Sequence, residues 1–188
     1  MRIISGNYKG KKILLPKDKL TRPLKDITKE SIFNIIKHSK LLDINLENSN
    51  ILDLFSGVGS FGLECLSRGA ASVTFLESYK DVLTVLKKNI KNLKQEVSSS
   101  IIEKDIFAEN TLKILSNKFD IIFMDPPYKE KKIVALLDTI IKLKLLKNSG
   151  TIIIHRHKKE EDIFPSELDV IIEKNYGISK IIFGKILT

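Results

Sequence analysis

Four acidic side chains in this sequence follow short apolar segments, at places where α/β proteins usually bind ligands. Asp53, Glu77, Asp105 and Asp125 each lie at or just after the end of an apolar run. If these runs are parallel strands, their carboxyl ends meet at one edge of a sheet, where open α/β sheets bind their ligands. Each acid alone has an ordinary structural explanation, such as capping a turn or a helix. Their occurrence at four successive strand ends predicts a binding site.

A glycine-rich turn follows the first of these acids. Residues 51–64 read Ile-Leu-Asp-Leu-Phe-Ser-Gly-Val-Gly-Ser-Phe-Gly-Leu-Glu, which is typical of a strand, a tight turn and a helix. The glycines match the dinucleotide pattern G-x-G-x-x-G, and they would let backbone N–H groups approach a ligand closely. Glu77 comes 20 residues after Gly57, the offset at which an acid binds ribose hydroxyls. Either NAD or S-adenosylmethionine would fit this pattern.

The position of Asp53 favours a cationic ligand. In a dinucleotide fingerprint the first glycine follows the strand directly, and the helix N-terminus faces a pyrophosphate. Here Asp53 and three further residues precede Gly57, and a carboxylate so close would repel a diphosphate. An acid suits the sulfonium and amino groups of S-adenosylmethionine instead.

A second motif, Asp125-Pro126-Pro127-Tyr128, follows the apolar run 119–124. Consecutive prolines remove two backbone donors and fix φ, which leaves the carbonyls of residues 125 and 126 free to accept hydrogen bonds. With the Asp125 carboxylate they would form an acceptor-rich pocket for an exocyclic amine, and a base could stack on Tyr128. The alternative is a rigid turn with a surface tyrosine. A place at the end of a fourth strand, beside the glycine turn, favours the pocket.

The elements that would position these residues alternate along the chain. From residue 51 onward, apolar runs alternate with amphipathic segments, which predicts a mostly parallel, doubly wound α/β sheet with helices on both faces. Two apolar runs, 168–176 and 178–187, meet at Gly177 and predict an antiparallel hairpin at the sheet edge. We expect strands at 51–54, 72–77, 100–103, 119–124 and 150–155, and helices at 60–69, 80–95, 107–117 and 130–145.

Positive charge is concentrated at the N-terminus. Residues 1–40 hold eleven Lys or Arg against three acids, a net charge of +8, whereas the rest of the chain carries +1 of the total of +9. Such asymmetry favours a nucleic-acid partner over a merely solubilising surface. Apolar runs at 2–4 and 13–15 predict a hairpin and residues 26–38 a helix. We therefore expect a basic N-terminal extension over residues 1–45 and a second domain over 46–188.

Composition limits the remaining classes. The chain has 188 residues, enough for one substantial core, and no apolar run approaches the roughly 18 residues that span a bilayer. With no signal-peptide pattern at the N-terminus, we expect a cytoplasmic protein. The single cysteine, Cys65, excludes an internal disulfide framework and is expected to be a buried hydrophobe. The three histidines show no metal-ligand spacing, so we expect no metal, and we expect a monomer.

The two motifs together resemble the amino-methyltransferases of the Rossmann-like class. Further segments resemble the RsmD-type methyltransferases, which methylate N2 of a guanine in small-subunit (16S) ribosomal RNA. One departure concerns Ile27, because the family usually reads Asp-Arg-Val-Arg-Glu where this chain has Asp26-Ile-Thr-Lys-Glu30. A contact made by the first arginine cannot be carried to Ile27. The segments that carry the resemblance are Arg2-Ile-Ile-Ser-Gly6, Thr21-Arg-Pro23, Lys29-Glu-Ser-Ile-Phe-Asn34, Gly62-Leu-Glu64, Leu66-Ser-Arg-Gly-Ala70 and Tyr176-Gly177.

The resemblance implies S-adenosyl-L-methionine as cofactor, and ribosomal RNA or the assembling small subunit as partner. The glycine turn would hold the methionine part, Glu77 the ribose and Asp105 the adenine amino group. The implied cofactor contacts are Asp53, Ser56, Gly57, Gly59, Glu77, Asp105 and Ile106. The target guanine would be held by Asp125, Pro126 and Tyr128. Expected substrate contacts are Lys9, Lys11, Lys12, Arg22 and Pro127.

Three other functions compete with this interpretation. A DNA amino-methyltransferase would share the Asp-Pro-Pro-Tyr chemistry, but the chain has no obvious extra domain for reading a DNA sequence. An NAD-linked oxidoreductase is disfavoured by Asp53 and by the absence of an evident hydride-transfer residue. A non-catalytic RNA-binding module would need the basic N-terminus but neither pocket motif.

Overall fold

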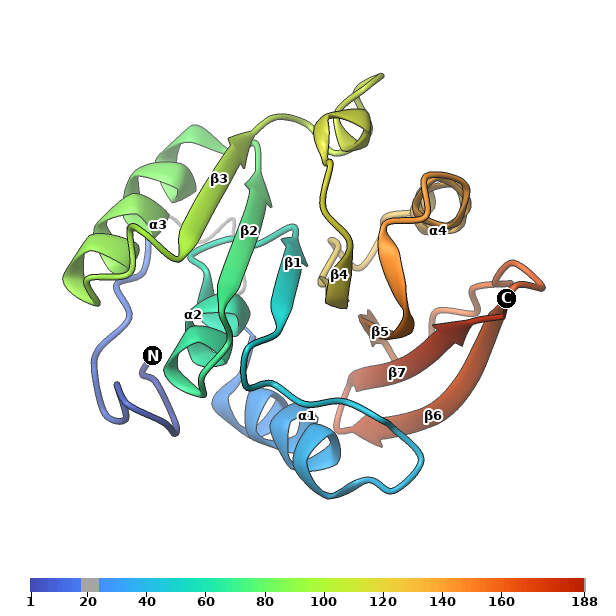
Figure 1. Ribbon diagram of the computed structural model, residues 1–188, viewed down its shortest axis with the longest axis horizontal. Coiled ribbons are helices and arrows are strands. Elements are labelled where there is room, and N and C mark those ends of the chain that lie inside the picture. The colour runs from blue at the N-terminus through green and yellow to red at the C-terminus, as the bar shows by residue number, and fades with distance from the viewer. Residues whose placement is uncertain (18–23, 188) are drawn as a thin grey trace.

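Seven strands form one sheet in the computed structural model, which describes residues 1–17 and 24–187. The strand order is β3-β2-β1-β4-β5-β7-β6 (Figure 1). The first five strands are parallel, and β7 runs antiparallel to both β5 and β6. This confirms the predicted mostly parallel sheet with a C-terminal antiparallel hairpin. The strands are β1 (Asn50–Leu54), β2 (Ser72–Glu77), β3 (Ser99–Glu103), β4 (Phe119–Met124), β5 (Leu146–His157), β6 (Leu168–Tyr176) and β7 (Ser179–Ile186).

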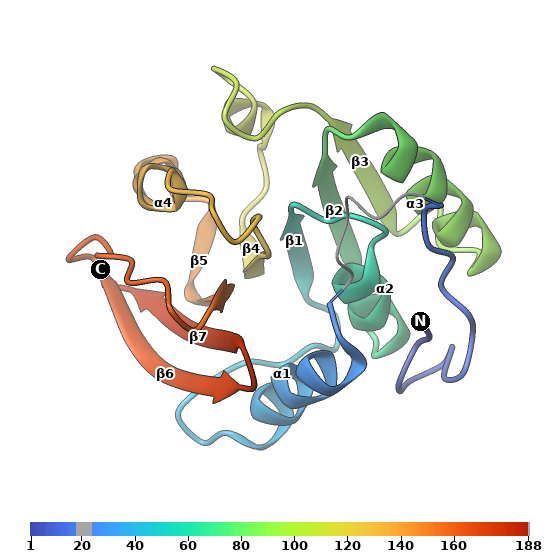
Figure 2. The ribbon, with the colours of Figure 1, turned by 180° about the vertical axis from the view of Figure 1, so that it is seen from behind.

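Helices cover both faces of the sheet because its strands are apolar on both sides. Ile51 packs in the core shared with α1, α2 and α3, whereas its neighbour Leu52 packs in the core shared with α4. Figure 1 shows α1 and α2 on one side of the curved sheet and α4 on the other, and Figure 2 shows the same layers from behind. Side chains alternate between the faces of a strand, so Asp53 lies on the face of α1 and α2. The helices are α1 (Asp26–His38), α2 (Ser60–Ser67), α3 (Lys80–Asn92) and α4 (Ile133–Lys142).

Apolar spacing explains which side each helix buries. In α3 the buried apolar residues are Val82, Leu83, Leu86 and Ile90, spaced so that they share one face of a helix. In α1 the boundaries are those predicted, with an acid in the first turn and Lys37 and His38 in the last, which favours the helix electrostatically. Cys65 is fully buried within α2, as predicted.

The predicted helix over 107–117 is wrong. Only a short 3-10 helix, Leu112–Ile114, forms in this connection. The Asp105 carboxylate accepts a hydrogen bond from the backbone N–H of Phe107, and Asn110 adopts a left-handed φ of 69°. Side chains that bond to nearby backbone compete with the helix, and the segment has too few buried apolar residues to reverse that preference. Strand β4 is therefore reached through a loop.

The predicted N-terminal hairpin forms as a short, irregular antiparallel pair: Arg2 and Lys12 are bridged, and the backbone N–H groups of Ile3 and Ile13 donate to the carbonyls of Lys11 and Met1 at 2.9 and 3.0 Å. Donors that the pair leaves free bond to helices: Ile4 and Ser5 donate to the carboxylate of Glu64 in α2, at 2.8 and 2.9 Å. The backbone N–H of Leu14 donates to the Asn89 side chain in α3 at 2.8 Å. The N-terminal segment is thus attached to two helices that flank the glycine turn, and its residues Ile3 and Ile13 are buried in the core with them.

Among the residues that the structure describes, no helix is both long and apolar enough to cross a membrane.

Candidate functional site

The glycine turn lies between β1 and α2 and has the backbone conformation that glycine permits. Gly57 has a φ of 55° and Gly59 a φ of 82°, a region in which a Cβ is strained. A Cβ at Gly59 would also collide with Leu86 of α3, whereas a Cβ at Gly57 would meet no atom within 4 Å. Gly59 is therefore required by packing against α3. Gly57 leaves its backbone open to an approaching ligand.

Glu77 ends β2 and holds this turn in place. One carboxylate oxygen accepts a hydrogen bond of 2.9 Å from the backbone N–H of Gly57. The other accepts bonds from the backbone N–H groups of Ser78 and Tyr79, at 2.8 and 2.9 Å. Ser56 adds a second link to β2, since its backbone N–H donates to the Leu76 carbonyl at 3.1 Å. A carboxylate offers about four acceptor positions, so Glu77 keeps capacity for a ligand hydroxyl.

Asp53 lies beneath the turn and is 1% exposed. Its carboxylate accepts a hydrogen bond of 3.0 Å from the backbone N–H of Gly62, in the first turn of α2. Burial raises the pKa of Asp53 well above its ordinary value; the Gly62 bond opposes this rise, and the charges of Asp125 and Glu77 add to it. Three acids therefore lie close enough to interact at the carboxyl ends of β1, β2 and β4. A cation bound among them would favour the ionised form of Asp53.

Asp105 and Ile106 lie just beyond the end of β3. The carboxylate of Asp105 is exposed, and one of its oxygens accepts the bond from Phe107 described above. The Asp105 carbonyl accepts a second bond, from the Thr111 hydroxyl at 2.8 Å. Ile106 is buried in the core on the α4 side. Asp105 therefore shapes a turn at the same sheet edge as the other acids, and the residue itself is exposed.

Asp125 follows β4 and contacts a residue that sequence reasoning missed. One of its carboxylate oxygens is 2.7 Å from Nδ1 of His155. On the other side of the ring, Nε2 of His155 is 2.9 Å from the hydroxyl of Ser179. His155 lies near the end of β5, after the apolar run Ile152–Ile154. The rule that drew attention to the first four strand ends, a polar residue after an apolar run, could have identified it.

The two prolines and Tyr128 differ in exposure. Pro126 is buried, Pro127 is exposed and Tyr128 is half-buried. The ring of Tyr128 meets His155 and His157 edge-on, with centroid distances of 6.1 and 5.2 Å. Asp125 and Tyr128 therefore share a contact with one histidine, and both remain accessible from outside.

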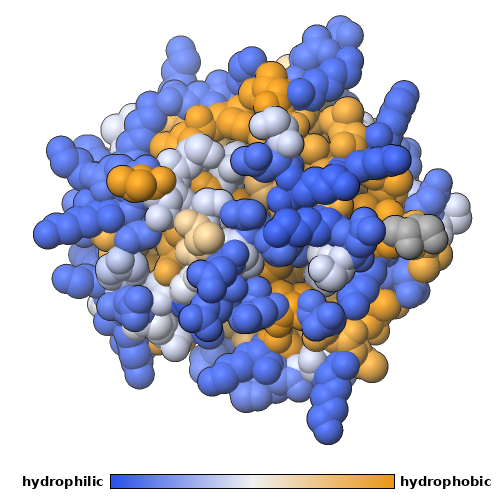
Figure 3. Space-filling view, viewed as in Figure 1, coloured by the Kyte–Doolittle hydropathy of each residue, from blue (hydrophilic) through white to orange (hydrophobic). Residues whose placement is uncertain are grey.

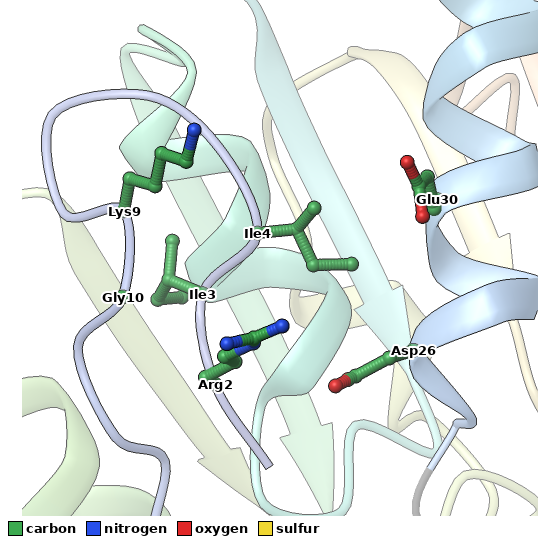
Figure 4. A pocket seen from close by; sticks show the side chains of 7 residues that line it. All are labelled: Arg2, Ile3, Ile4, Lys9, Gly10, Asp26 and Glu30. Atoms are coloured by element: carbon green, nitrogen blue, oxygen red, sulfur yellow. The ribbon is translucent and has the colours of Figure 1, made fainter.

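The basic residues expected to contact a polyanion lie in the N-terminal loop, apart from Arg22, which is outside the described residues. Lys9, Lys11 and Lys12 are all exposed. Lys9 and Arg2 border a pocket of about 180 Å³ whose opposite wall carries Asp26 and Glu30 of α1 (Figure 4). Ile27, in the first turn of α1, is 69% exposed. Hydrophilic side chains cover much of the face drawn in Figure 3, with apolar patches between them.

Buried charges fix the N-terminal loop against α1 and α2, and they too were missed. The ammonium of Lys29 donates to the Arg2 carbonyl at 2.9 Å and lies 3.7 Å from the Glu64 carboxylate. Glu64 also accepts a bond of 2.8 Å from Arg68. Burial lowers the pKa of Lys29, and the charges of Glu64 and Asp26 oppose that change. These side chains look like ordinary surface charges in the sequence, since Lys and Glu are almost never fully buried unless paired.

In the part of the chain that the structure describes, no three His, Cys, Asp or Glu side chains are grouped so that they could hold a metal ion. The groups described above are carboxylates, backbone groups, a histidine and an aromatic ring.

Comparisons with known proteins place the chain among close relatives. A family model described as Conserved hypothetical protein 95 matches residues 1–185. A protein from Buchnera aphidicola (subsp. Acyrthosiphon pisum), named ribosomal RNA small subunit methyltransferase D, is 36% identical over 167 residues, which cover 87% of this chain and 81% of the relative. The protein of that name from Haemophilus influenzae is 32% identical over 183 residues, covering 95% and 90%. A solved structure from Haemophilus influenzae, described as a methylase, has a TM-score of 0.77 and 29% identity, and covers 100% of this chain and 99% of its own.

Proposed function

The chain belongs to the family described as Conserved hypothetical protein 95, the RsmD-type methyltransferases with a Rossmann-like fold, and from this premise we propose its reaction. We propose that it transfers a methyl group from S-adenosylmethionine to the exocyclic N2 amine of a guanine in small-subunit ribosomal RNA. One observation carries the proposal: the acceptor motif beginning at Asp125 lies at the same sheet edge as the buried acid of the glycine turn, close enough for Asp125 to affect Asp53 electrostatically.

The residues around the turn fit S-adenosylmethionine. Gly57 leaves open space above the backbone, as close approach of a ligand requires. Asp53 is a buried carboxylate that gains from a nearby cation, and a buried acid would disfavour a diphosphate. Glu77 has acceptor capacity for a ribose hydroxyl, and the exposed carboxylate of Asp105 could accept a hydrogen bond from an adenine amine. When bound, the cofactor supplies a methyl group activated by its sulfonium.

The acceptors beginning at Asp125 would act on the substrate amine. The N2 lone pair of guanine is delocalised into the ring, so the amine is a weak nucleophile. The Asp125 carboxylate and the Pro126 carbonyl would accept its hydrogens and draw them out of the ring plane, which localises the lone pair on nitrogen. The new N–C bond would form as the C–S bond breaks, with neutral S-adenosylhomocysteine as the leaving group. The methylated amine would then be cationic and would release one of its hydrogens as a proton. Tyr128 would stack on the base. Most of the acceleration would come from alignment, which can supply about 7–11 kcal/mol.

The target base would have to leave its stack to reach this pocket, since enzymes that modify bases inside duplexes extrude them. Lys9, Lys11 and Lys12 are exposed on a loop held against α2 and α3. They would bind the phosphates that flank the extruded nucleotide. The names of the relatives, which refer to the small ribosomal subunit, support rRNA or an assembling subunit as the substrate.

The test compares Asp125→Ala with the wild-type protein. We expect methyl transfer to small-subunit RNA to be abolished, while calorimetry shows cofactor affinity largely unchanged. If cofactor binding is lost while turnover remains, the assigned roles are wrong. Duplex DNA is included as a competing substrate, and NADH replaces the cofactor in a thermal-shift control. Stabilisation by NADH without stabilisation by S-adenosylhomocysteine would contradict the proposed cofactor.

The identity of the target is tested in cells. Mass mapping of ribosomal RNA with and without the gene should reveal one guanine that loses its N2 methyl group. An unchanged methylation map would contradict the proposed reaction.

A further inference from the structure

We propose that His155 is a positioning residue for methyl transfer: it holds one carboxylate oxygen of Asp125 so that the other is directed at the substrate amine. This inference rests on the proposed function, because it takes Asp125 to be the acceptor for that amine. It assigns a role to a β5 residue that belongs to neither the glycine turn nor the Asp-Pro-Pro-Tyr motif.

The two ring nitrogens of His155 have complementary partners. Nδ1 is 2.7 Å from the Asp125 carboxylate, and Nε2 is 2.9 Å from the Ser179 hydroxyl. An ionised carboxylate can only accept a hydrogen bond, so the ring must carry its proton on Nδ1. The Ser179 hydroxyl can both donate and accept, so it satisfies Nε2 whether or not that nitrogen carries a proton. The partners are thus compatible with a ring whose Nδ1–H is directed at Asp125.

The sheet fixes the position of the ring. His155 pairs with Ile181 of β7, and its neighbour on the same face, His157, pairs with Ser179. Ser179 is thus the diagonal neighbour of His155 across an antiparallel pair, which is within reach of a long side chain. His155 is 6% exposed. Asp125 lies just beyond the carboxyl end of β4, and His155 lies near the carboxyl end of the parallel strand β5. The ring is therefore a rigid support for a side chain at the site.

Asp125 needs such a support. Its side chain is 21% exposed, and the backbone bond that anchors it, from its N–H to the Leu54 carbonyl, is long at 3.4 Å. The terminal torsion of an aspartate is broad, so an unrestrained carboxylate samples many orientations. A hydrogen bond to an ionised group is about twice as strong as a neutral one. One oxygen held by His155 would restrict that torsion and leave the second oxygen for the substrate.

The same ring also borders Tyr128, at a centroid distance of 6.1 Å and nearly perpendicular to it. The acceptor and the stacking surface for the base would therefore share one support. A displacement of about 1 Å at a reacting centre can cost on the order of 100-fold in rate. Loss of the histidine should consequently lower turnover by about that factor.

Two substitutions at His155 separate the effect of losing the N–H donor from the effect of losing the volume of the ring. His155→Leu keeps an apolar side chain of similar size without a donor, and His155→Asn keeps an N–H where Nδ1 lies. We expect kcat to fall about 100-fold in His155→Leu and less than about 10-fold in His155→Asn. Cofactor Kd from calorimetry should stay within about twofold in both, since neither touches the glycine turn. His38→Asn, the same change at an exposed position at the end of α1, is the matched control.

Three kinetic results would overturn the proposal. The first is an unchanged kcat in folded His155→Leu. The second is an equal loss in the Asn and Leu variants, which would show that the donor is not what matters. The third is a rise in cofactor Kd that matches the fall in kcat, which would indicate general loosening of the site. Ser179→Ala removes the outer partner of the ring. If His155→Leu fails to fold, kcat and cofactor Kd are compared between His155→Asn and Ser179→Ala instead.

A spectroscopic measurement tests the contact without RNA. The proton on Nδ1 should give a downfield resonance in the wild-type protein that disappears in Asp125→Ala, and its absence from the wild type would contradict the contact. If the resonance is present but the wild-type protein methylates no RNA, the proposed function fails and the positioning role fails with it, while the hydrogen bond stands. The two failures are therefore distinguishable.

Discussion

The carboxylate of Glu77 accepts a hydrogen bond of 2.9 Å from the backbone N–H of Gly57. This bond joins the end of β2 to the turn after β1, two segments that are 20 residues apart in the chain. An acid at this position shapes the turn, and in the proposed function it would also contact the ligand that the turn holds. Its removal should therefore affect cofactor binding in two ways.

Glu77→Ala should weaken cofactor affinity more than turnover. Hydrogen bonds to charged groups contribute about 1.5–3 kcal/mol, so we expect Kd for S-adenosylmethionine to rise by about 10- to 100-fold in calorimetry. At saturating cofactor, kcat should recover most of its wild-type value. Glu103→Ala is the matched control, because Glu103 is the register partner of Glu77 on β3 and is exposed. A fall in kcat with an unchanged Kd would place Glu77 outside the cofactor site.

Asp53→Asn should change how stability depends on pH. The folded protein raises the pKa of Asp53 above its unfolded value of about 3.9. Between these two pKa values the folded chain keeps a proton that the unfolded chain has lost, so wild-type stability falls as pH rises through that window. The Asn variant has no such proton to lose. Urea unfolding should therefore show a stability advantage for Asp53→Asn that is absent below about pH 4 and grows as pH rises.

The same substitution should have the opposite effect on cofactor binding. A bound cation favours ionised Asp53, so wild-type affinity for S-adenosylmethionine should increase with pH, and Asp53→Asn should lose this increase. Asp169→Asn, at an exposed position on β6, is the control. In the urea-unfolding experiment, a stability advantage of Asp53→Asn over wild type that shrinks with rising pH would contradict the raised pKa of Asp53.

The sheet was predictable because its strands correspond to short apolar runs in the sequence. The boundaries of α1 and β2 agree with prediction to the residue. The segment 107–117 was not predictable from its pattern, because bonds from Asp105 and a left-handed Asn110 decide its conformation locally. The sequence could also show that acids lie at strand ends, and parallel topology then brings Asp53, Glu77 and Asp125 to one edge.

The supports of the site depend on contacts between distant segments. His155 reaches Ser179 only because β7, the last strand, inserts between β5 and β6. The pattern of a hairpin does not say which of its strands pairs with β5. Glu64 and Lys29 occupy helix positions at which charged residues are common, yet both are fully buried where the N-terminal loop contacts them.

Glu64→Ala should lower the free energy of unfolding by about 3–5 kcal/mol, the usual cost of removing one partner from a buried ion pair. The variant leaves Lys29 buried without its main counter-charge, and it leaves the backbone N–H groups of Ile4 and Ser5 without their acceptor. Urea unfolding measures the loss, and hydrogen exchange should accelerate at those two amides. Glu96→Ala, at an exposed position, should stay within about 0.5 kcal/mol of wild type. A comparably small change in Glu64→Ala would mean that the loop is held by its apolar contacts alone.

Replacement of Lys9, Lys11 and Lys12 by alanine should weaken RNA binding and reduce its salt dependence. All three side chains are exposed on the loop that Glu64 and Asn89 hold in place. Each phosphate contact contributes roughly 0.7 to the slope of log K against log salt for a single strand, so the triple variant should lose about 2 units of slope. Fluorescence anisotropy with a small-subunit RNA fragment measures this over a salt series. The control replaces Lys113, Lys118 and Lys142, which are also exposed but lie in or near the 3-10 helix and α4. Because both variants lose the same charge, an equal loss of slope would indicate a non-specific effect of net charge, and an unchanged slope in the first variant would remove the N-terminal loop from the RNA contact.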